Sequence, residues 1–239
     1  MTIRNSLRRF TVLGALAAIA GPIALSDSTG TTVAENAAEP RALVILGASY
    51  AQGWGTPALP GFQRVINRGV GGEETSGMLR RFPADVVAAN ADAVLIWGHV
   101  NNISRAAPDR IEAAKLAARR DFDAMLKLAQ SADIEVILAT EVPWTERSGI
   151  LETLYGWYAA LRGKTSYAAR VSAHVEEVNE YLRTLARREN LRLLDFGRAF
   201  ANEAGTRKAE FGAEDGSHIT AAGYAALSTY ARKELQRAK

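Results

Sequence analysis

The sequence predicts a three-layer α/β/α sandwich built on a mainly parallel sheet of five strands. Two observations predict this fold class. Short, continuous apolar segments alternate along the chain with longer segments in which apolar residues recur at helical spacing. Strands that alternate with helices are joined by right-handed crossovers, which make the sheet parallel and cover both of its faces. In such a sheet, ligands bind at the carboxyl ends of the strands.

The expected elements follow in chain order. Four apolar segments have the composition of strands buried on both faces, and a fifth is weaker. The four are 41–47 (RALVILG), 92–98 (DAVLIWG), 134–139 (IEVILA) and 191–196 (LRLLDF), and the fifth is 63–67. Helical spacing runs from Ile111 to Ala129 after Pro108, from Val171 to Leu185, and from Ala222 to Leu235. We expect Pro83 to divide residues 75–90 into two short helices.

Residues 1–26 have the pattern of a secretory signal peptide, with three arginines before an apolar stretch at 10–25. An uncleaved membrane anchor is the alternative, but this stretch is short for a bilayer and is interrupted by glycine and proline. Residues 27–40 are small and polar, which indicates a flexible lead-in, and residues 41–239 form one predicted domain. We therefore expect a periplasmic or extracellular protein with no stable membrane insertion after signal removal.

The charge of the chain excludes some partners. The net charge is +3, but residues 1–26 hold three of the 29 Lys and Arg and none of the 26 Asp and Glu. The remainder is neutral, so the composition gives no support for a nucleic-acid partner. The chain has no cysteine, which excludes disulfides and thiol catalysis.

Ser49 directly follows the first predicted strand, in the sequence Gly47-Ala48-Ser49-Tyr50. A serine on a tight turn at a strand end can expose its hydroxyl while its backbone N–H faces the same space. A serine in a glycine-bounded turn is also ordinary turn chemistry. Ser49 is therefore a candidate nucleophile only in combination with other groups.

The second motif pairs Asp215 with His218, just before the last predicted helix. A carboxylate three residues before a histidine can fix its tautomer and stabilise its imidazolium within one turn. The alternative is a helix-capping Asp with an incidental His. Of the other two histidines, we interpret His174 as structural, and His99 lies in the exit loop of the third strand, where it could line the pocket.

Two further turns offer donors for a developing oxyanion. The glycine-rich turn 67–72 (NRGVGG) leaves the second strand, and residues 98–102 (GHVNN) leave the third. The first offers a backbone N–H without interference from a Cβ, and the second offers a side-chain amide. Together with Ser49 and the Asp215/His218 pair, they supply a nucleophile, a base, an orienting group and oxyanion donors.

With these residues, the segment 41–239 resembles the SGNH hydrolases, also called the GDSL esterase/lipase family. The resemblance implies a flavodoxin-like fold, a catalytic triad of Ser49, Asp215 and His218, an oxyanion hole with Gly72 and Asn101, and no metal or cofactor. Three departures stand out. Ala48 replaces the usual Asp in a family motif that reads Gly-Asp-Ser-Leu, Asn102 replaces a second Asp, and Ile219 replaces a frequent Pro.

The resemblance implies a serine ester hydrolase that acts through an acyl-enzyme on a small-molecule, polysaccharide or lipid ester. The enzyme would be a short-chain acyl or acetyl esterase, or be lysophospholipase-like. An exported carbohydrate O-acyltransferase is an alternative, and a non-catalytic binding protein is another, favoured by Ala48 and Asn102. An α/β-hydrolase is disfavoured, because that fold places its serine after several strands.

The aromatic residues near these motifs allow two interpretations. Residues 141–165 include Trp144, Tyr155, Trp157 and Tyr158, which could form a lid or platform for a substrate, or could pack a small helix onto the domain. Trp54, soon after Ser49, raises the same question.

Overall fold

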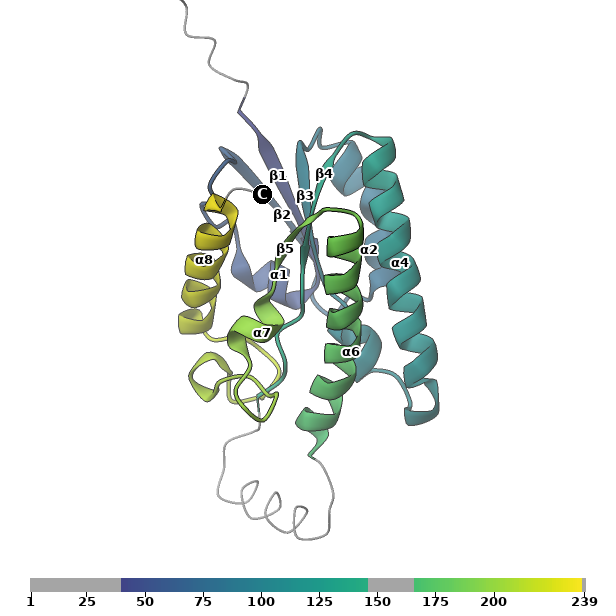
Figure 1. Ribbon diagram of the computed structural model, residues 1–239, viewed down its shortest axis with the longest axis vertical. Helices are drawn as coiled ribbons and strands as arrows, with labels where there is room; N and C mark the ends of the chain where they lie inside the picture. The colour runs from purple at the N-terminus through teal and green to yellow at the C-terminus, as the bar shows by residue number, and fades with distance from the viewer. Residues whose placement is uncertain (1–39, 146–165, 238–239) are drawn as a thin grey trace, which may run out of the picture. The chain divides into compact units, whose positions relative to one another are not determined.

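The computed structural model describes residues 40–145 and 166–237, which lie within one compact unit spanning residues 39–239. Five strands form a single sheet in the order β2-β1-β3-β4-β5, and every neighbouring pair is parallel (Figure 1). The predicted fold class is therefore confirmed. The predicted signal peptide and all of the lead-in except residue 40 lie outside the described residues, so both stay predictions.

The elements have the following bounds. The strands are β1 (Ala42–Gly47), β2 (Arg64–Gly69), β3 (Ala93–Trp97), β4 (Glu135–Ala139) and β5 (Arg192–Leu194). The α-helices are α1 (Ser49–Trp54), α2 (Thr75–Phe82), α3 (Val100–Ser104), α4 (Ile111–Ser131), α6 (Tyr167–Arg188), α7 (Phe196–Phe200) and α8 (Ala221–Gln236). The short helices are the π-helix η1 (Pro83–Val87) and the 3₁₀-helices η2 (Pro108–Arg110) and η3 (Ala209–Phe211).

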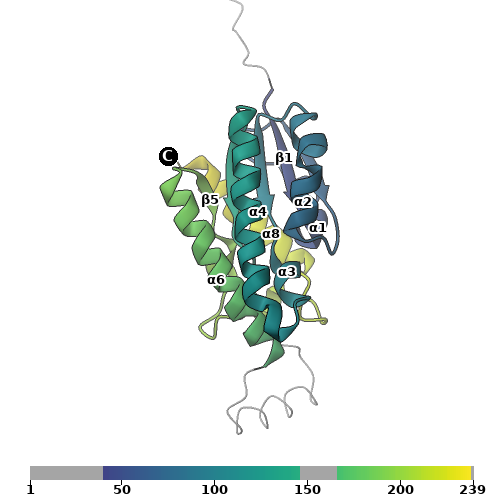
Figure 2. The same ribbon diagram turned by 90° about the vertical axis from the view of Figure 1, so that its right-hand side faces the viewer.

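Helices cover both faces of the sheet. Alternate residues of each strand point to opposite sides, so the apolar strands place side chains on both faces. Val44 and Leu46 of β1 face a core built with α2, α4 and α6. Leu43 and Ile45 face the other side, where α1, α7 and α8 pack. Figures 1 and 2 show α2 and α4 on one side of the sheet and α8 on the other. β1 and β3 are apolar throughout because both of their faces are buried.

Proline and capping chemistry decide where several elements end. Pro83 ends α2 and begins the π-helix η1, so the predicted division of residues 75–90 is found at that residue. The fifth strand is shorter than the predicted 191–196. Asp195 accepts a hydrogen bond from the backbone N–H of Arg198 and caps α7, which turns the chain away from the sheet.

In the described ranges 40–145 and 166–237, no helix combines the length and the apolar character needed to cross a membrane.

The parallel arrangement brings the predicted site segments to one edge of the sheet. β1 ends at Gly47, directly before Ser49, and the turns after β2 and β3 carry Gly72 and Asn101. A Cβ on Gly47 would lie 2.2 Å from the carbonyl oxygen of Trp97, so only glycine lets β1 and the start of α1 approach β3 this closely. The close approach keeps Ser49 beside the exit of β3.

Candidate active site

Ser49 is the first residue of α1, and its side chain is partly exposed. Among the described residues, its hydroxyl makes no hydrogen bond, so it is available to a substrate. Its backbone N–H lies in the first turn of a helix, where no intrahelical acceptor exists. Ala48 precedes it without a side-chain cap. The serine thus presents both a hydroxyl and an unused backbone donor at the edge of the sheet.

Asp215 and His218 form a compact turn before α8. Nδ1 of His218 is hydrogen-bonded to Oδ2 of Asp215, and Oδ1 of Asp215 accepts the backbone N–H groups of Ser217 and His218 at 2.9 Å each. The two side chains are 46% and 57% exposed, the imidazole more so. Partial burial raises the pKa of Asp215, but the hydrogen bonds from His218 and Ser217 outweigh it and hold this pKa well below its usual range. The carboxylate stays ionised and orients the imidazole.

The turn of His218 is joined to the start of α1 by a direct contact. The hydroxyl of Tyr50 donates a hydrogen bond of 2.5 Å to the carbonyl of Ser217. Tyr50 follows Ser49 and Ser217 precedes His218, so this contact holds the turn that carries His218 against the start of α1. Ser49 and His218 are not hydrogen-bonded to each other in this structure.

The two predicted oxyanion donors lie next to each other. Nδ2 of Asn101 donates to the carbonyl of Glu73 at 2.8 Å, which fixes the amide beside Gly72. Gly72 has φ +75°, and a Cβ there would lie 2.6 Å from Nη2 of Arg105. The positive φ favours glycine at this position, whereas the flexible Arg105 side chain could move away from a Cβ. The second N–H of the Asn101 amide has no partner among the described residues, so it remains free to donate.

Asn102 has a structural role that accounts for its presence where the family usually has an acid. Its side chain is 6% exposed. Oδ1 accepts the backbone N–H of Thr75 at 3.1 Å, and Nδ2 donates to the Thr75 hydroxyl at 3.0 Å. The Thr75 hydroxyl in turn donates to Asp121 at 2.5 Å. Asn102 thus ties the helix after β3 to the start of α2.

The other two histidines are placed away from the chemistry. His99 is 1% exposed, so it does not line an open pocket as the sequence suggested it could. Burial lowers its pKa to about 3, while its contact with the carbonyl of Val175 at 3.3 Å opposes the change. His174 is hydrogen-bonded to Glu177 on its own helix, in agreement with the structural role expected for it.

The sequence profile of the GDSL-like lipase/acylhydrolase family matches residues 45–226, which is most of the chain. The chain belongs to this family. Its members are hydrolases of ester bonds, so the predicted family and enzyme class are confirmed. No curated protein matches the chain.

Solved structures agree in fold. A proposed acylhydrolase from Bacteroides fragilis has a TM-score of 0.62 and 22% identity, covering 82% of this chain and 86% of that one. The lipase/acylhydrolase from Enterococcus faecalis has a TM-score of 0.56 and 21% identity, with 82% and 95% covered. The acetyl xylan esterase AlAXEase has a TM-score of 0.57 and 16% identity, with 79% and 96% covered. At these identities the similarity establishes a shared fold.

In this GDSL-family hydrolase, Glu141 supports the loop that carries Asn101. Glu141 follows β4 and is 1% exposed. Its Oε1 accepts the backbone N–H groups of His99 at 2.8 Å and Val100 at 3.3 Å, at the start of α3. Burial raises the pKa of Glu141 to about 7, although these hydrogen bonds and the charge of Arg207 oppose the rise. The carboxyl group therefore fixes the backbone directly before the predicted oxyanion amide.

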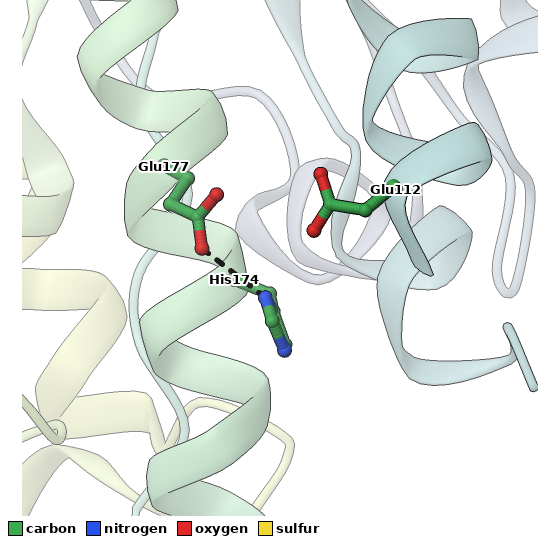
Figure 3. A group of neighbouring side chains, drawn as sticks. All are labelled: Glu112, His174 and Glu177. Carbon is green, nitrogen blue, oxygen red and sulfur yellow. Dashed lines mark hydrogen bonds and ion pairs between the residues drawn. The ribbon is translucent and has the colours of Figure 1, made fainter. Parts of the chain in front are cut away.

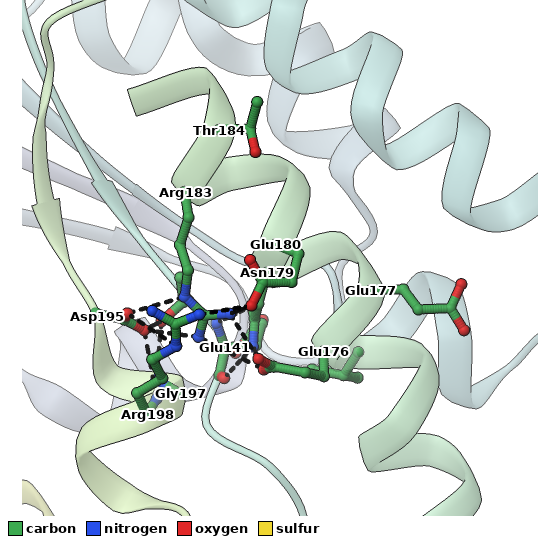
Figure 4. A network of polar contacts seen from close by, with 12 residues as sticks. Glu141, Glu176, Glu177, Asn179, Glu180, Arg183, Thr184, Asp195, Gly197 and Arg198 are labelled. Carbon is green, nitrogen blue, oxygen red and sulfur yellow. Dashed lines mark hydrogen bonds and ion pairs between the residues drawn. The ribbon is translucent and has the colours of Figure 1, made fainter. Parts of the chain in front are cut away.

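A polar network anchors the backbone of Glu141 to α6 (Figure 4). The amide of Asn179 accepts the backbone N–H of Glu141 at 2.8 Å and donates to its carbonyl at 2.9 Å. Asn179 also donates to Glu176, which pairs with the buried Arg183. Arg183 then binds Asp195 through two hydrogen bonds of 2.8 Å. The loop after β4 is thus anchored to α6 and to the start of α7.

The pKa of Glu141 predicts how stability depends on pH. Between its ordinary value of 4.5 and about 7, the folded state binds more protons than the unfolded state, so stability falls as pH rises. Glu141→Gln keeps an oxygen acceptor for His99 and Val100 without a charge. From pH 5 to pH 8, urea denaturation should show the wild type losing up to about 3 kcal/mol of unfolding free energy relative to the variant. Parallel pH curves for the two proteins would contradict the prediction.

A cluster on α4 and α6 has the composition of a metal site, but a lysine already balances its negative charge. Ligand atoms of Glu112, His174 and Glu177 lie within 4.8 Å of one another (Figure 3). However, Nζ of Lys115 lies 2.5 Å from a carboxylate oxygen of each glutamate, and Lys115 is 2% exposed. A buried ammonium supplies the positive charge that a cation would bring. The cluster therefore joins the two helices as an ion-pair network.

Trp54 belongs to the core of the hydrolase, and Trp144 packs at its margin. Trp54 is 6% exposed, and its Nε1 donates to Ser228 on α8 at 2.8 Å. Its ring packs edge-on against Trp97 and Phe196. Trp144 is partly buried against Tyr167. Packing accounts for both tryptophans. The predicted lid residues Tyr155, Trp157 and Tyr158 lie outside the described residues, so the lid stays a prediction.

Sequence reasoning missed three residues at this site, Tyr50, Glu141 and Arg207. All three are buried polar groups whose partners lie far away in the sequence. One signal was present, because Tyr50 stands where the family motif has leucine. A hydroxyl at a buried, normally apolar position needs a partner.

Proposed function

We propose that this chain is an exported serine esterase that cleaves carboxylic esters through an acyl-enzyme on Ser49. The observation that carries the proposal is the hydrogen bond from Tyr50 to the carbonyl of Ser217, since it joins the neighbour of Ser49 to the neighbour of His218. The ionised Asp215 bonded to Nδ1 of His218 leaves Nε2 of the imidazole as the basic nitrogen. The basic and apolar residues 1–26 support export.

In the proposed reaction, His218 takes the proton of the Ser49 hydroxyl as the Ser49 oxygen bonds to the ester carbonyl carbon. The backbone N–H groups of Ser49 and Gly72 and the Asn101 amide hold the oxyanion. The bond to the alcohol then breaks, and the imidazolium returns its proton to the leaving oxygen. His218 then takes a proton from a water molecule as the water oxygen bonds to the acyl carbon. The imidazolium gives that proton to the Ser49 oxygen as the acyl–serine bond breaks and the acid leaves.

We propose short acyl esters carried on a larger alcohol as the substrate class. The His218 side chain is 57% exposed, which supports access to it by an ester with a bulky alcohol portion. Export favours esters of the cell envelope or the extracellular space, and acetylated polysaccharide is one that carries a short acyl group. Lysophospholipid carries a long acyl group and is an outcome of the test below. Acyl transfer to a sugar instead of water uses the same residues and is an outcome of the test below.

The test measures hydrolysis of p-nitrophenyl acetate, butyrate and octanoate by the purified protein, with labelling by a fluorophosphonate probe in parallel. We expect turnover that is fastest on the shorter esters, and a label on the peptide that contains Ser49. A lysophospholipase-like enzyme would prefer octanoate. A sugar acceptor that captures the acyl group would indicate an acyltransferase. No turnover together with no label would contradict the proposal and favour a binding protein.

The amide of Asn101 gives a further prediction. Asn101→Ala should lower kcat roughly a hundred- to a thousand-fold, because it removes one oxyanion donor from the transition state. KM should change little, and the fold should persist because the side chain is partly exposed. Asn102→Ala is the contrast. It should lower the melting temperature by freeing Thr75, with a smaller effect on kcat. Equal kcat values for Asn101→Ala and the wild type would remove Asn101 from the oxyanion hole.

A further inference from the structure

Arg207 is a buried cation, and its guanidinium contacts the segments that carry the proposed site residues. It lies in the loop between α7 and η3 and is 1% exposed. Nε donates to the carbonyl of Pro143 at 2.8 Å, Nη1 to the carbonyl of His218 at 2.5 Å, and Nη2 to the carbonyl of Ser217 at 2.7 Å. Nη2 also donates to the Tyr50 hydroxyl at 2.9 Å. None of these acceptors is a carboxylate.

Tyr50, the residue after Ser49, contacts both Arg207 and the turn of His218. It is 3% exposed, and its hydroxyl accepts from Arg207 and donates to the carbonyl of Ser217. The Arg207 guanidinium lies 5.4 Å from the centre of the Tyr50 ring, which also packs against Trp97. Burial raises the pKa of Tyr50 above its ordinary value, which the charge of Arg207 opposes. The hydroxyl is therefore neutral and available as both donor and acceptor.

The two side chains act on the backbone around His218. The carbonyls of Ser217 and His218 lie on the two sides of the His218 Cα, the atom that carries the imidazole side chain. Ala213 also donates to the His218 carbonyl, at 2.9 Å. With Arg207 and Tyr50 in place, the His218 backbone is fixed relative to α1, even though the imidazole itself is exposed. A displacement of about 1 Å at a catalytic group can cost a hundredfold in rate.

A purely stabilising role would not require this chemistry. A buried guanidinium that makes no hydrogen bond to a carboxylate is costly to desolvate, and apolar residues of similar volume often stabilise a fold as well or better. Within the part of the chain that the structure describes, the hydrogen bonds of the Arg207 side chain nevertheless go to Tyr50, to the His218 turn and to Pro143. The buried charge therefore lies among the contacts that set the spacing between Ser49 and His218.

We propose that Tyr50 and Arg207 are positioning residues that hold His218 within reach of Ser49. This inference rests on the proposed function, since it assigns the two residues a part in the same reaction. It also explains why a tyrosine occupies the position after Ser49 in this chain. The hydroxyl is the part of Tyr50 that makes the connection, so its removal alone should affect the reaction.

The test compares Tyr50→Phe with Tyr181→Phe in the full chain. Tyr50→Phe keeps the ring and removes the hydroxyl. Tyr181→Phe is a matched control, because that hydroxyl donates to Asp123 between α6 and α4. On p-nitrophenyl acetate, below the melting temperature of each variant, we expect Tyr50→Phe to lower kcat about tenfold with KM within twofold. Labelling of Ser49 by the fluorophosphonate should slow in proportion. Tyr181→Phe should leave kcat and labelling unchanged.

Arg207 supplies a second comparison. Arg207→Met should lower kcat by at least as much as Tyr50→Phe, and Arg207→Lys should recover part of the loss because it restores a donor. Wild-type kcat in a folded Tyr50→Phe, or an equal loss in Tyr181→Phe, would overturn the positioning role while leaving the esterase intact. A wild-type protein with neither turnover nor label would overturn both proposals.

Discussion

Replacing Ser49 with alanine should reduce kcat/KM for p-nitrophenyl esters by about 10⁴-fold or more, because no acyl-enzyme can form without the hydroxyl. The residual rate would come from the oxyanion donors and from substrate binding. The fold should be unaffected, since the Ser49 hydroxyl has no hydrogen-bond partner among the described residues. Steady-state kinetics, fluorophosphonate labelling and thermal melting of the variant beside the wild type measure all three expectations.

The decisive control is Ser217→Ala, because Ser217 is the other serine close to the base. Its hydroxyl lies 3.3 Å from Nδ1 of His218. That nitrogen is already engaged by Asp215, so Ser217 faces the wrong side of the ring to be activated. We expect Ser217→Ala to retain activity within a few-fold. Loss of turnover and of labelling in Ser217→Ala, with both preserved in Ser49→Ala, would move the nucleophile to Ser217.

The fold was predictable because it depends on signals that are local in the sequence. β1, β3 and β4 are buried on both faces, so their segments are continuously apolar. β2 gave a weaker signal because it is the edge strand and most of its residues are only partly buried. The length of β5 was harder to predict, because its end depends on the cap that Asp195 provides for α7.

The candidate site divides in the same way. Ser49, Gly72 and Asn101 follow strands directly, and the Asp215/His218 pair lies within one turn, so motif spacing identifies them. Their supports could not be found in this way. Arg207 meets Pro143 and Tyr50 across 64 and 157 residues of sequence, and no spacing rule encodes such contacts. Glu141 likewise reaches back 42 residues to His99. Each predicted motif is local in sequence, whereas the alignment of the motifs with one another depends on the tertiary fold.

His218→Ala should be nearly as damaging as Ser49→Ala, lowering kcat by about 10⁴- to 10⁶-fold, because the hydroxyl would lose its general base. His174→Ala is the matched control, since that imidazole contacts only Glu177 in the described region. It should leave kcat unchanged. A folded His218→Ala that keeps wild-type kcat would exclude His218 as the base.

Asp215→Asn tests the same pair through the tautomer of the imidazole. The asparagine oxygen can still accept the backbone N–H groups of Ser217 and His218, so the turn should persist. Its NH₂ group would face Nδ1 of His218 and favour the tautomer with the proton on Nε2, which cannot accept the proton of Ser49. The low pKa of Asp215 keeps this carboxylate ionised in mild acid, so its charge stays available to orient the imidazole there. A large fall in kcat with an unchanged melting temperature would assign Asp215 to orienting the base rather than to holding the turn.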